Sequence, residues 1–390
     1  MYPKISDLIN DWFGTNLNLP IQSYGFCLAL AFLFSGWTLY KELERKEKEG
    51  ILKAGKKKIQ IGKPATISEL TTTFLVSLFV FFKLAGIFTD YSLFAGNPQK
   101  FIFSGEGNWL IGFLAAAILT GWSYYDKKRK EIRPPQWKEM IIHPKDLLWQ
   151  IIFIAVIFGI IGAKIFDQLE NFDSFLKDPV GTTLSFSGLT FYGGLIVAAI
   201  ALIYFGHKNG ISWKVLGDIT APGLILAYGI GRIGCQVAGD GDWGIVNHLQ
   251  KPNWLSFLPD WAWAYNYPHN IINHGIKIPG CTGPHCYQLA EAVFPTPVYE
   301  TTMAIVIFAI LWYLRKRIKI AGMLFAIYLM FNGLERFLIE LIRVNNVYHI
   351  AGIAVTQAEI ISPILFLSGL VMIIMLNKQA KKNQPLKPQS

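Results

Sequence analysis

The chain has 390 residues, of which 52% are hydrophobic and only 16% charged, and its mean hydropathy is +0.36. An ordinary soluble domain carries about 25% charged residues, so this composition argues against a soluble globular protein. The net charge of +10 would suit a nucleic-acid partner, but its distribution along the chain has a simpler explanation, given below.

Apolar stretches long enough to cross about 30 Å of hydrocarbon as helices recur along the chain. They lie at 21–40, 69–89, 107–125, 147–166, 189–206, 215–235, 297–314, 321–343 and 357–377. The sequence therefore predicts an all-α, polytopic integral membrane protein with about nine transmembrane helices. No segment is large enough to fold as a separate soluble domain, so residues 1–390 are expected to form a single membrane domain.

The basic residues are concentrated on alternate connections. Of the 36 lysines and arginines, 26 lie at 41–64, 126–145, 206–214, 315–319 and after residue 377. Such an excess marks the cytoplasmic side of a membrane. The expected topology has the N-terminus outside and the C-terminus in the cytoplasm, and nucleic-acid binding becomes an unnecessary hypothesis.

The connections differ in character. The first twenty residues lack the basic start of a signal peptide, so 21–40 is expected to be a retained helix. Segment 41–68 is a basic cytoplasmic loop or helix, and 66–125 is a helical hairpin. In 126–145, prolines break helix and Trp137 suits the membrane interface. The tail 378–390 is expected to be disordered.

The external connection 241–296 exceeds fifty residues and is too long for a simple connector. It is rich in Trp, Tyr, Asn and Pro, and we expect its aromatic side chains at headgroup depth. Cys281 and Cys286 lie on this oxidising side, where a disulfide is plausible. A metal site with His285 is the alternative, but this spacing supplies too few ligands, so no metal is expected.

Arg232 ends an apolar stretch, within GRIGCQVAGDGDW. The surrounding glycines approach the dinucleotide-binding pattern, but that pattern needs a preceding strand, and here it ends a membrane helix. Close helix packing explains the glycines and leaves the arginine unexplained. An ionisable group in the hydrocarbon is costly, so a function is its default explanation. A guanidinium just below the external interface is well suited to bind a lipid phosphate.

A second charged group lies in NGLERFLIELIRVN. At 100° per residue, Asn332, Arg336, Glu340 and Arg343 share one helix face, and Glu335 points away. A neutralised network between helices is one explanation. The face carries two arginines to one glutamate, however, which leaves one positive charge for an anionic ligand. Arg336 is expected to lie deeper and to be catalytic, and Arg343 to lie nearer the surface.

Other residues give weaker signals. Glu300, placed in the first turn of a span opened by Pro297, resembles an ordinary helix cap. Tyr192, followed by Gly193 and Gly194, and Tyr24 in the first span fit either an interfacial tyrosine or a substrate contact. Lys83 and Lys164 also lie within predicted spans, and Lys164 is expected to pair with Asp167 or to reach the surface.

Taken together, these stretches resemble the prolipoprotein diacylglyceryl transferase family of bacterial inner-membrane enzymes. The matching pieces are IQSYGF, GAKIFDQLE, LTFYGGLI, GRIGCQVAGDGDWG, TPVYE, NGLERFLIELIR and VTQAEIIS. They cover 21–40 and about 147–377, which would be the catalytic core of seven spans. The hairpin 66–125 is then additional to the family plan.

The resemblance implies a reaction without a cofactor. Such enzymes transfer the diacylglyceryl group of phosphatidylglycerol to the thiol of a lipobox cysteine in a prolipoprotein signal peptide, within the bilayer. A thioether forms and glycerol phosphate leaves. The nucleophile belongs to the substrate and must be a thiolate, so no Ser–His–Asp set is needed. Arginines in a low-dielectric site would stabilise the leaving phosphate.

The resemblance also implies roles for individual residues. Arg232 and Arg336 match indispensable arginines, Glu340 a pairing acid, Tyr24 the first-helix tyrosine and Asp240 an acidic position. With one residue inserted, Trp243 and Gly244 match the end of the motif. The expected catalytic residues are Arg232, Arg336, Tyr192 and Tyr24. The expected substrate-binding residues are Gly193, Gly194, Gln236, Asp240, Gly244, Tyr299, Glu300, Glu340 and Arg343.

Two departures bear on mechanism. Tyr192 replaces a histidine that is a candidate base in the family, and a tyrosine, with an ordinary pKa of about 10, is a poor base at neutral pH. Cys235 replaces a signature asparagine. A lipid transporter using the same arginines is the main alternative function, although no inverted repeat is evident. A scaffold role for the external loop is the third.

Overall fold

The computed structural model describes residues 1–96, 101–102, 104–185, 188, 190–344, 347–350 and 353–382. The chain separates into two compact units. Unit 1 comprises 1–52, 147–170 and 190–390, and unit 2 comprises 53–146 and 171–189. The candidate site lies in unit 1.

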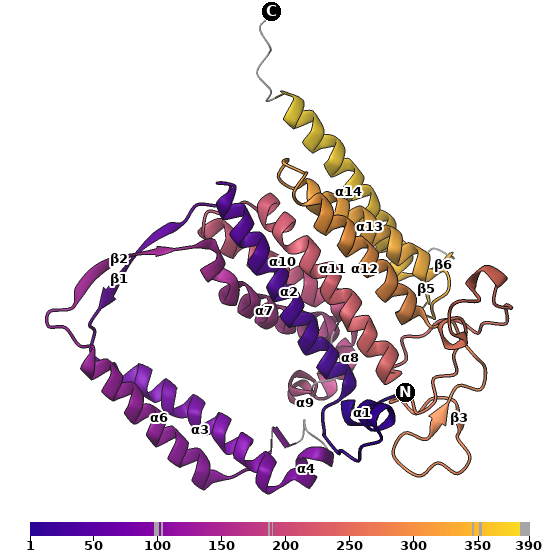
Figure 1. Cartoon of the computed structure of the whole chain (residues 1–390), viewed down its shortest axis with the longest axis horizontal. Coiled ribbons are helices and arrows are strands. Elements are labelled where there is room, and N and C mark those ends of the chain that lie inside the picture. Colours follow the sequence, from indigo (N-terminus) through magenta and orange to yellow (C-terminus); the bar gives the residue numbers. More distant parts are fainter. Residues whose placement is uncertain are drawn as a thin grey trace, which may run out of the picture. The chain divides into compact units, whose positions relative to one another are not determined.

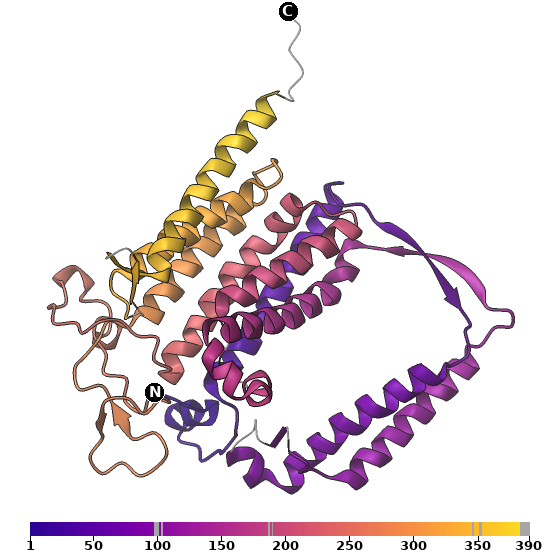
Figure 2. The same ribbon diagram turned by 180° about the vertical axis from the view of Figure 1, so that it is seen from behind.

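Unit 1 is a bundle of long helices. Figure 1 shows them running alongside one another, and Figure 2 gives the same bundle from behind. Its helices are α1 (Ile5–Phe13), α2 (Ser23–Lys48), α7 (Leu148–Glu170) after the short 3-10 turn Pro144–Leu147, α10 (Phe191–Lys208), α11 (Trp213–Ala238), α12 (Thr296–Leu314), α13 (Met323–Glu340) and α14 (Gln357–Lys382). Two short strands, β5 (Val347–Ile350) and β6 (Ile353–Thr356), form an antiparallel pair before α14.

Helix α11 lies at the centre of this bundle. It packs against α2, α12 and α13, while α7 pairs with α10 and α13 with α14. Buried apolar side chains of α11, α12 and α13 form one core, made of Ile225, Ala304, Ile307, Leu311 and Leu324. Asp218 of α11 accepts hydrogen bonds from the backbone N–H groups of Gly322 and Phe325, which fixes the start of α13.

Each predicted apolar stretch coincides with a helix in the described residues. Six of these helices are long and apolar enough to cross a membrane: α2, α3, α7 with its preceding turn, α10, α12 and α14. The protein is therefore a multi-pass membrane protein. Helix α6 (Trp109–Arg129), α11 and α13 fall short of that apolarity, and charged residues in α11 and α13 contribute to this.

Unit 2 contains the helical hairpin. Helix α3 (Ile67–Thr89) packs against α6, and Lys83 donates hydrogen bonds to the carbonyl oxygens of Phe101, Ser104 and Glu106. These carbonyl oxygens, together with the Phe82 and Phe101 rings 4.9 Å from the ammonium, explain the buried lysine. The hairpin leads into an antiparallel ribbon of β1 (Gly55–Ile61) and β2 (Gln136–Ile142), which the sequence did not predict. The short helices are α4 (Tyr91–Gly96), α8 (Phe172–Lys177) and α9 (Pro179–Leu184).

The long connection between α11 and α12 is a folded structure with its own core. Trp243, Tyr267, Leu289 and Val293 pack together, and fully buried Asn270 hydrogen-bonds three backbone carbonyls. Its short elements are the 3-10 turns Asn253–Leu255 and Asp260–Ala262 and the strands β3 (Ile276–Lys277) and β4 (Tyr287–Gln288).

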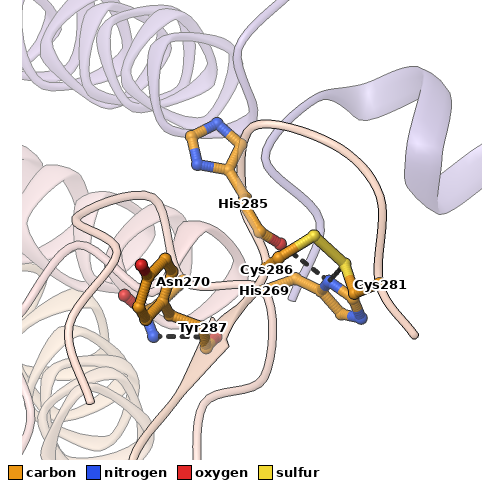
Figure 3. Close-up of a disulfide and its surroundings, with 6 residues drawn as sticks. All are labelled: His269, Asn270, Cys281, His285, Cys286 and Tyr287. Carbon is orange, nitrogen blue, oxygen red and sulfur yellow. Dashed lines mark hydrogen bonds between the residues drawn. A yellow bond between two sulfur atoms is a disulfide. The ribbon is translucent and has the colours of Figure 1, made fainter. Parts of the chain in front are cut away.

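The disulfide that was plausible from the sequence is present: Cys281 and Cys286 are bonded beside His269, whose ring lies 2.8 Å from the His285 carbonyl oxygen (Figure 3). The Met1 amino group donates to the Pro268 carbonyl at 2.8 Å, which ties the N-terminus to this loop. At the other end of the chain, α14 continues to Lys382, into the segment expected to be disordered, and residues 383–390 lie outside the described residues.

Candidate active site

The site begins at the end of α11, where the sequence placed Arg232. The helix ends at Gly239, which adopts the left-handed conformation with φ of 67°. Added Cβ atoms at Gly229 and Gly234 would lie 2.9 Å from Ala304 of α12 and 3.0 Å from Cys27 of α2. The small residues therefore let three helices approach closely and place Arg232, whose side chain is 16% exposed, between them.

Glu300 of α12 is the point at which three guanidinium groups converge. Its carboxylate lies 2.5 Å from Arg232 Nε, 3.0 Å from Arg343 Nη1 and 3.9 Å from Arg336 Nη1. The Glu300 side chain is fully buried, a position that requires such counter-charges. The expectation of a first-turn cap is wrong: α12 begins at Thr296, so Glu300 lies in the second turn and faces the arginines.

Asp242, in the loop that follows α11, bridges two of these arginines. One carboxylate oxygen pairs with Arg232 Nη1 and the other with Arg343 Nη2. Burial alone would raise the pKa of Asp242, but the two guanidiniums outweigh it and hold the pKa below its ordinary value. Asp242 was not among the residues expected from the sequence.

Asp240, the acid expected from the sequence, occupies a different position. It receives the backbone N–H of Asp242 at 3.3 Å and is associated with the Cys235 thiol, and no described ion pair joins it to an arginine. Burial, together with repulsion from Asp242, raises the pKa of Asp240. Its assignment as a substrate-binding residue stays a prediction.

Arg336 and Arg343 lie on different structural elements, although the sequence predicted that they share one helix face. Helix α13 ends at Glu340, so Arg343 lies beyond it. Arg336 Nη2 pairs with Glu340 at 3.0 Å, four residues along the helix, whereas Arg343 pairs with Glu300 and Asp242. Arg343 is slightly more buried within the protein than Arg336, at 10% against 19% side-chain exposure. The expected order of their depths in the membrane stays a prediction.

Gly244 explains how Arg343 is held. The two residues form an isolated antiparallel bridge, beside which Ile245 N donates to the Ile342 carbonyl oxygen. Gly244 N donates instead to the Phe294 carbonyl oxygen within the external loop. A Cβ at Gly244 would lie 2.5 Å from the Ile342 carbonyl oxygen, so no larger residue fits. The glycine at the end of the motif thus joins the external loop to the end of α13, a structural role beside its expected contact with substrate.

The balance of charge also differs from expectation. The sequence predicted one unpaired positive charge on α13, but Arg232, Arg336 and Arg343 are matched by Asp242, Glu300 and Glu340. The excess charge is therefore absent from the described ion pairs. An anion binds here only by replacing one of the protein's own carboxylates or by sharing their donors.

A buried tyrosine–glutamate pair borders the cluster. The Tyr228 ring lies 5.0 Å from the Arg232 guanidinium carbon, and its hydroxyl donates to Glu335 Oε1 at 3.2 Å. Glu335 is 2% exposed, and its side chain contacts α11. Helical periodicity correctly separated Glu335 from Arg336 but could not show that α11 lies on that other side.

Comparison with known sequences gives this geometry a context. Residues 108–375 match the family model described as prolipoprotein diacylglyceryl transferase. The chain belongs to this family.

Its relatives include phosphatidylglycerol–prolipoprotein diacylglyceryl transferases of three bacteria. That of Staphylococcus carnosus is 31% identical over 273 residues, covering 69% of this chain and 86% of the relative. That of Staphylococcus xylosus is 28% identical over 279 residues, covering 71% and 87%. That of Corynebacterium glutamicum (strain ATCC 13032) is 27% identical over 245 residues, covering 60% and 71%. This chain is accordingly an enzyme of the transferase class.

Within this transferase family member, several predicted residues border the arginine cluster. Tyr24 packs over Gly234 and lies within electrostatic range of Arg232, Asp240 and Asp242. Cys235, at the position of the family asparagine, lies 3.9 Å from Arg232 Nη1 and 3.7 Å from Asp242.

Two other predicted residues contact the external loop instead. Gln236 accepts a hydrogen bond from the Tyr267 hydroxyl at 2.7 Å, and Tyr299 donates to the Trp263 carbonyl at 3.3 Å. Both side chains therefore help to attach the loop to the helices. Their contact with substrate stays a prediction.

The predicted site residues on α10, which are Tyr192, Gly193 and Gly194, show no described contact with the arginine cluster. Gly193 and Gly194 are buried against α7, and a Cβ at Gly194 would lie 2.8 Å from the Gly159 carbonyl oxygen. Close helix packing thus accounts for both glycines. The Tyr192 ring contacts Phe191, and among the described residues no hydrogen bond joins its hydroxyl to the arginines. A catalytic role for Tyr192 stays a prediction.

Three potential metal ligands, Cys235, Asp240 and Asp242, have donor atoms within 4.8 Å of one another. Both Asp242 oxygens already pair with guanidiniums, however, and these positive groups would repel a cation. This donor set suits an anion-binding arginine site better than a metal.

Proposed function

We propose that this protein transfers the diacylglyceryl group of phosphatidylglycerol to the lipobox cysteine of prolipoproteins, with Arg232, Arg336 and Arg343 stabilising the phosphate. The observation that carries the proposal is the convergence of these three guanidiniums, from α11, α13 and the segment after α13, on one buried carboxylate. Such an arrangement positions several N–H donors before any ligand arrives.

The reaction exchanges one bond for another. The substrate thiolate attacks the glyceryl carbon attached to the phosphate oxygen, a carbon–sulfur bond forms, and the carbon–oxygen bond breaks. The electron pair leaves on that oxygen, so glycerol phosphate departs with one more negative charge than the phosphodiester carried. The arginine cluster, with side chains at most 19% exposed, is a low-dielectric site in which preorganised donors act strongly on this charge.

The other residues act around this centre. Glu300 and Glu340 hold the arginines in fixed geometry through the ion pairs described above, which spares reorganisation during the reaction. Tyr24, which packs over Gly234 near the end of α11, contacts the lipid headgroup in this proposal. Tyr192, if it contacts substrate, acts as a hydrogen-bonding group.

The proposed setting is the bacterial inner membrane, crossed nine times, with the N-terminus outside and the C-terminus in the cytoplasm. The distribution of lysine and arginine supports this orientation. The contact of Met1 with Pro268 supports placing the N-terminus and the 241–296 loop on one side. Helices α11 and α13 are counted among the nine spans because their charged residues pair inside the bundle, where a membrane protein tolerates them.

The test is release of glycerol phosphate from labelled phosphatidylglycerol by the purified protein, with a lipobox peptide as acceptor. We expect release to require the peptide and to match thioether lipopeptide formation one to one. A peptide with serine in place of the cysteine is the matched control and supports no release, because the thiolate is lost.

Two results would contradict the proposal. Release that is independent of the peptide would indicate a hydrolase. Movement of phosphatidylglycerol between leaflets, without release in either reaction, would instead support the transporter alternative.

A further inference from the structure

The Asp242 carboxylate bridges Arg232 and Arg343 in the way that the two free oxygens of a phosphodiester would. Each of its oxygens pairs with a different guanidinium, and the two arginines come from different segments of the chain. Paired N–H donors on guanidiniums are the preferred partners of both carboxylates and phosphates. Asp242 and a lipid phosphate therefore need the same donors.

We propose that Asp242 is a displaceable occupant of the lipid-phosphate site and sets the affinity of the enzyme for phosphatidylglycerol. This inference rests on the function proposed above. The phosphate replaces the carboxylate between Arg232 and Arg343, and Asp242 moves toward the external side. The free energy of lipid binding is then the difference between the free energies with which the lipid phosphate and the Asp242 carboxylate bind the same two arginines.

Charge favours this exchange over simple addition. With three arginines matched by Asp242, Glu300 and Glu340, an extra anion would give these six groups a net negative charge. Once Asp242 leaves, the three arginines face two carboxylates. The single positive charge that remains is the one that a phosphodiester requires.

Among the three carboxylates, Asp242 is the one built to move. Glu300 and Glu340 lie on membrane helices with side chains 0% and 2% exposed, whereas Asp242 lies on a loop and is 33% exposed. It follows Gly241, whose φ of 103° is a backbone conformation that other residues rarely adopt. The neighbouring Trp243 and Gly244 are fixed in the loop core and the bridge to Arg343, and the Asp242 carbonyl accepts a hydrogen bond from the buried Thr296 hydroxyl at 2.9 Å. The change is therefore confined to the Asp242 side chain and the backbone of about 239–241.

The experiment compares Asp242→Asn with Glu291→Gln in the full-length protein. Glu291→Gln also removes one negative charge from the 241–296 loop, at an exposed side chain outside the arginine cluster. Binding of dioleoyl-phosphatidylglycerol in nanodiscs of phosphatidylcholine is measured, together with the KM for this lipid in the peptide assay. If the site is free of Asp242 about one tenth of the time, Asp242→Asn should lower the Kd about tenfold, and Glu291→Gln should leave it within about twofold.

A second measurement uses thermal unfolding in detergent. Without added lipid, Asp242→Asn should melt below the wild type, since two arginines lose a partner, and phosphatidylglycerol should raise its Tm more than that of the wild type. Inorganic phosphate tests whether the headgroup charge alone suffices, and should inhibit Asp242→Asn more strongly. If Asp242→Asn does not fold, Asp242→Ser provides the same comparison.

An unchanged or higher Kd for Asp242→Asn would overturn the proposal, as would equal tightening by Glu291→Gln. These failures are distinct from failure of the transferase assignment. Lipid binding that tightens in Asp242→Asn, in a protein that forms no thioether peptide, would refute the transfer and leave the role of Asp242 intact. Normal transfer without tightening would refute only the role of Asp242.

Discussion

Two buried ion clusters lie at opposite ends of α12. Comparing them distinguishes a cluster that stabilises the fold from one that can bind a ligand. One surrounds Glu300 near the start of the helix, and the other surrounds Glu42 of α2, which pairs with Arg45 and with Arg315 just after the helix end. The fifteen residues from Glu300 to Arg315 correspond to about 22 Å of helix. Both clusters contain fully buried glutamates and several arginines.

The arginines of the Glu42 cluster are held by groups on its own helices. Arg315 donates to the Trp312 carbonyl and stacks 3.2 Å from the centre of the Trp312 ring, and Arg45 also pairs with Glu49. Its charged groups lie on helices or directly at a helix end. The Glu300 cluster includes instead a carboxylate on a glycine-containing loop, Asp242. A buried charge alone therefore does not identify a ligand-binding site. The distinguishing feature is a carboxylate that a ligand can replace.

The largest expected effect comes from breaking the Glu300 cluster at Arg232. Replacement by alanine should lower the rate of thioether formation about 10³-fold, because loss of one preorganised donor typically costs 10²–10³ in rate (about 3–4 kcal/mol). Arg232→Lys should recover little, since an ammonium cannot pair with Asp242 and Glu300 in the same fork geometry. The assay is initial-rate transfer to a lipobox peptide.

The control for Arg232 is Arg317→Ala. Arg317 is exposed near the end of α12, with its guanidinium 4.3 Å from the Tyr313 ring centre, and its loss should leave the rate within about twofold. A rate for Arg232→Ala within about threefold of the wild type would remove this arginine from the proposed mechanism.

Breaking the other cluster should affect stability instead. Glu42→Gln leaves Arg315 without its buried counter-charge and should lower the free energy of unfolding by about 3 kcal/mol. The transfer rate per folded molecule should stay within about twofold. Thermal unfolding in detergent and specific activity on the same sample measure the two quantities.

Glu44→Gln is the matched control for Glu42. Glu44 lies on the same helix in partly exposed pairs with Lys41 and Lys48, which are each worth under about 1 kcal/mol. If Glu42→Gln lost activity without losing stability, the distinction between the two clusters would fail.

The sequence predicted the bundle and part of the site. Hydropathy located the long helices, because a span must carry some twenty apolar residues in a row. Arg232 and Arg336 were evident because charge in such a stretch is costly and therefore informative. Glu300 was underrated, since a glutamate near a helix start has an ordinary explanation as a cap.

Other features depend on contacts that the sequence does not encode locally. Asp240 and Asp242 both follow α11, and only the path of the loop decides which of them reaches the arginines. The end of α13 at Glu340 is set by the bridge between Gly244 and Arg343, a pairing across about a hundred residues. The ribbon of β1 and β2 likewise joins segments separated by the whole hairpin, so neither strand is evident by itself.

The two loop aspartates should respond to pH in opposite directions. The pKa of Asp240 is raised on folding, so its contribution to stability is present below the unfolded pKa and is lost as pH rises through the folded pKa. Asp240→Asn should therefore raise the Tm at neutral pH, and the gain should vanish under acid conditions.

Asp242 shows the reverse. Its pKa is lowered on folding, so its contribution is present above the unfolded pKa and is lost as pH falls through the folded pKa. Asp242→Asn should lower the Tm at neutral pH, with a deficit that shrinks on acidification. Tm profiles between about pH 4 and 8, near and above the ordinary aspartate pKa, measure both variants. Parallel profiles would contradict the assigned environments.

The smallest expected effect defines how far the Glu300 cluster extends. Tyr24 lies within electrostatic range of Arg232, whereas no hydrogen bond between the Tyr192 hydroxyl and the arginines is found among the described residues. Tyr24→Phe should lower the transfer rate about tenfold, as expected for a lost hydrogen bond to a charged group. Tyr192→Phe should change it less than about threefold, and Tyr192→His should bring no large gain. A tenfold loss in Tyr192→Phe would extend the site to α10 and restore Tyr192 as a group that acts directly on the substrate.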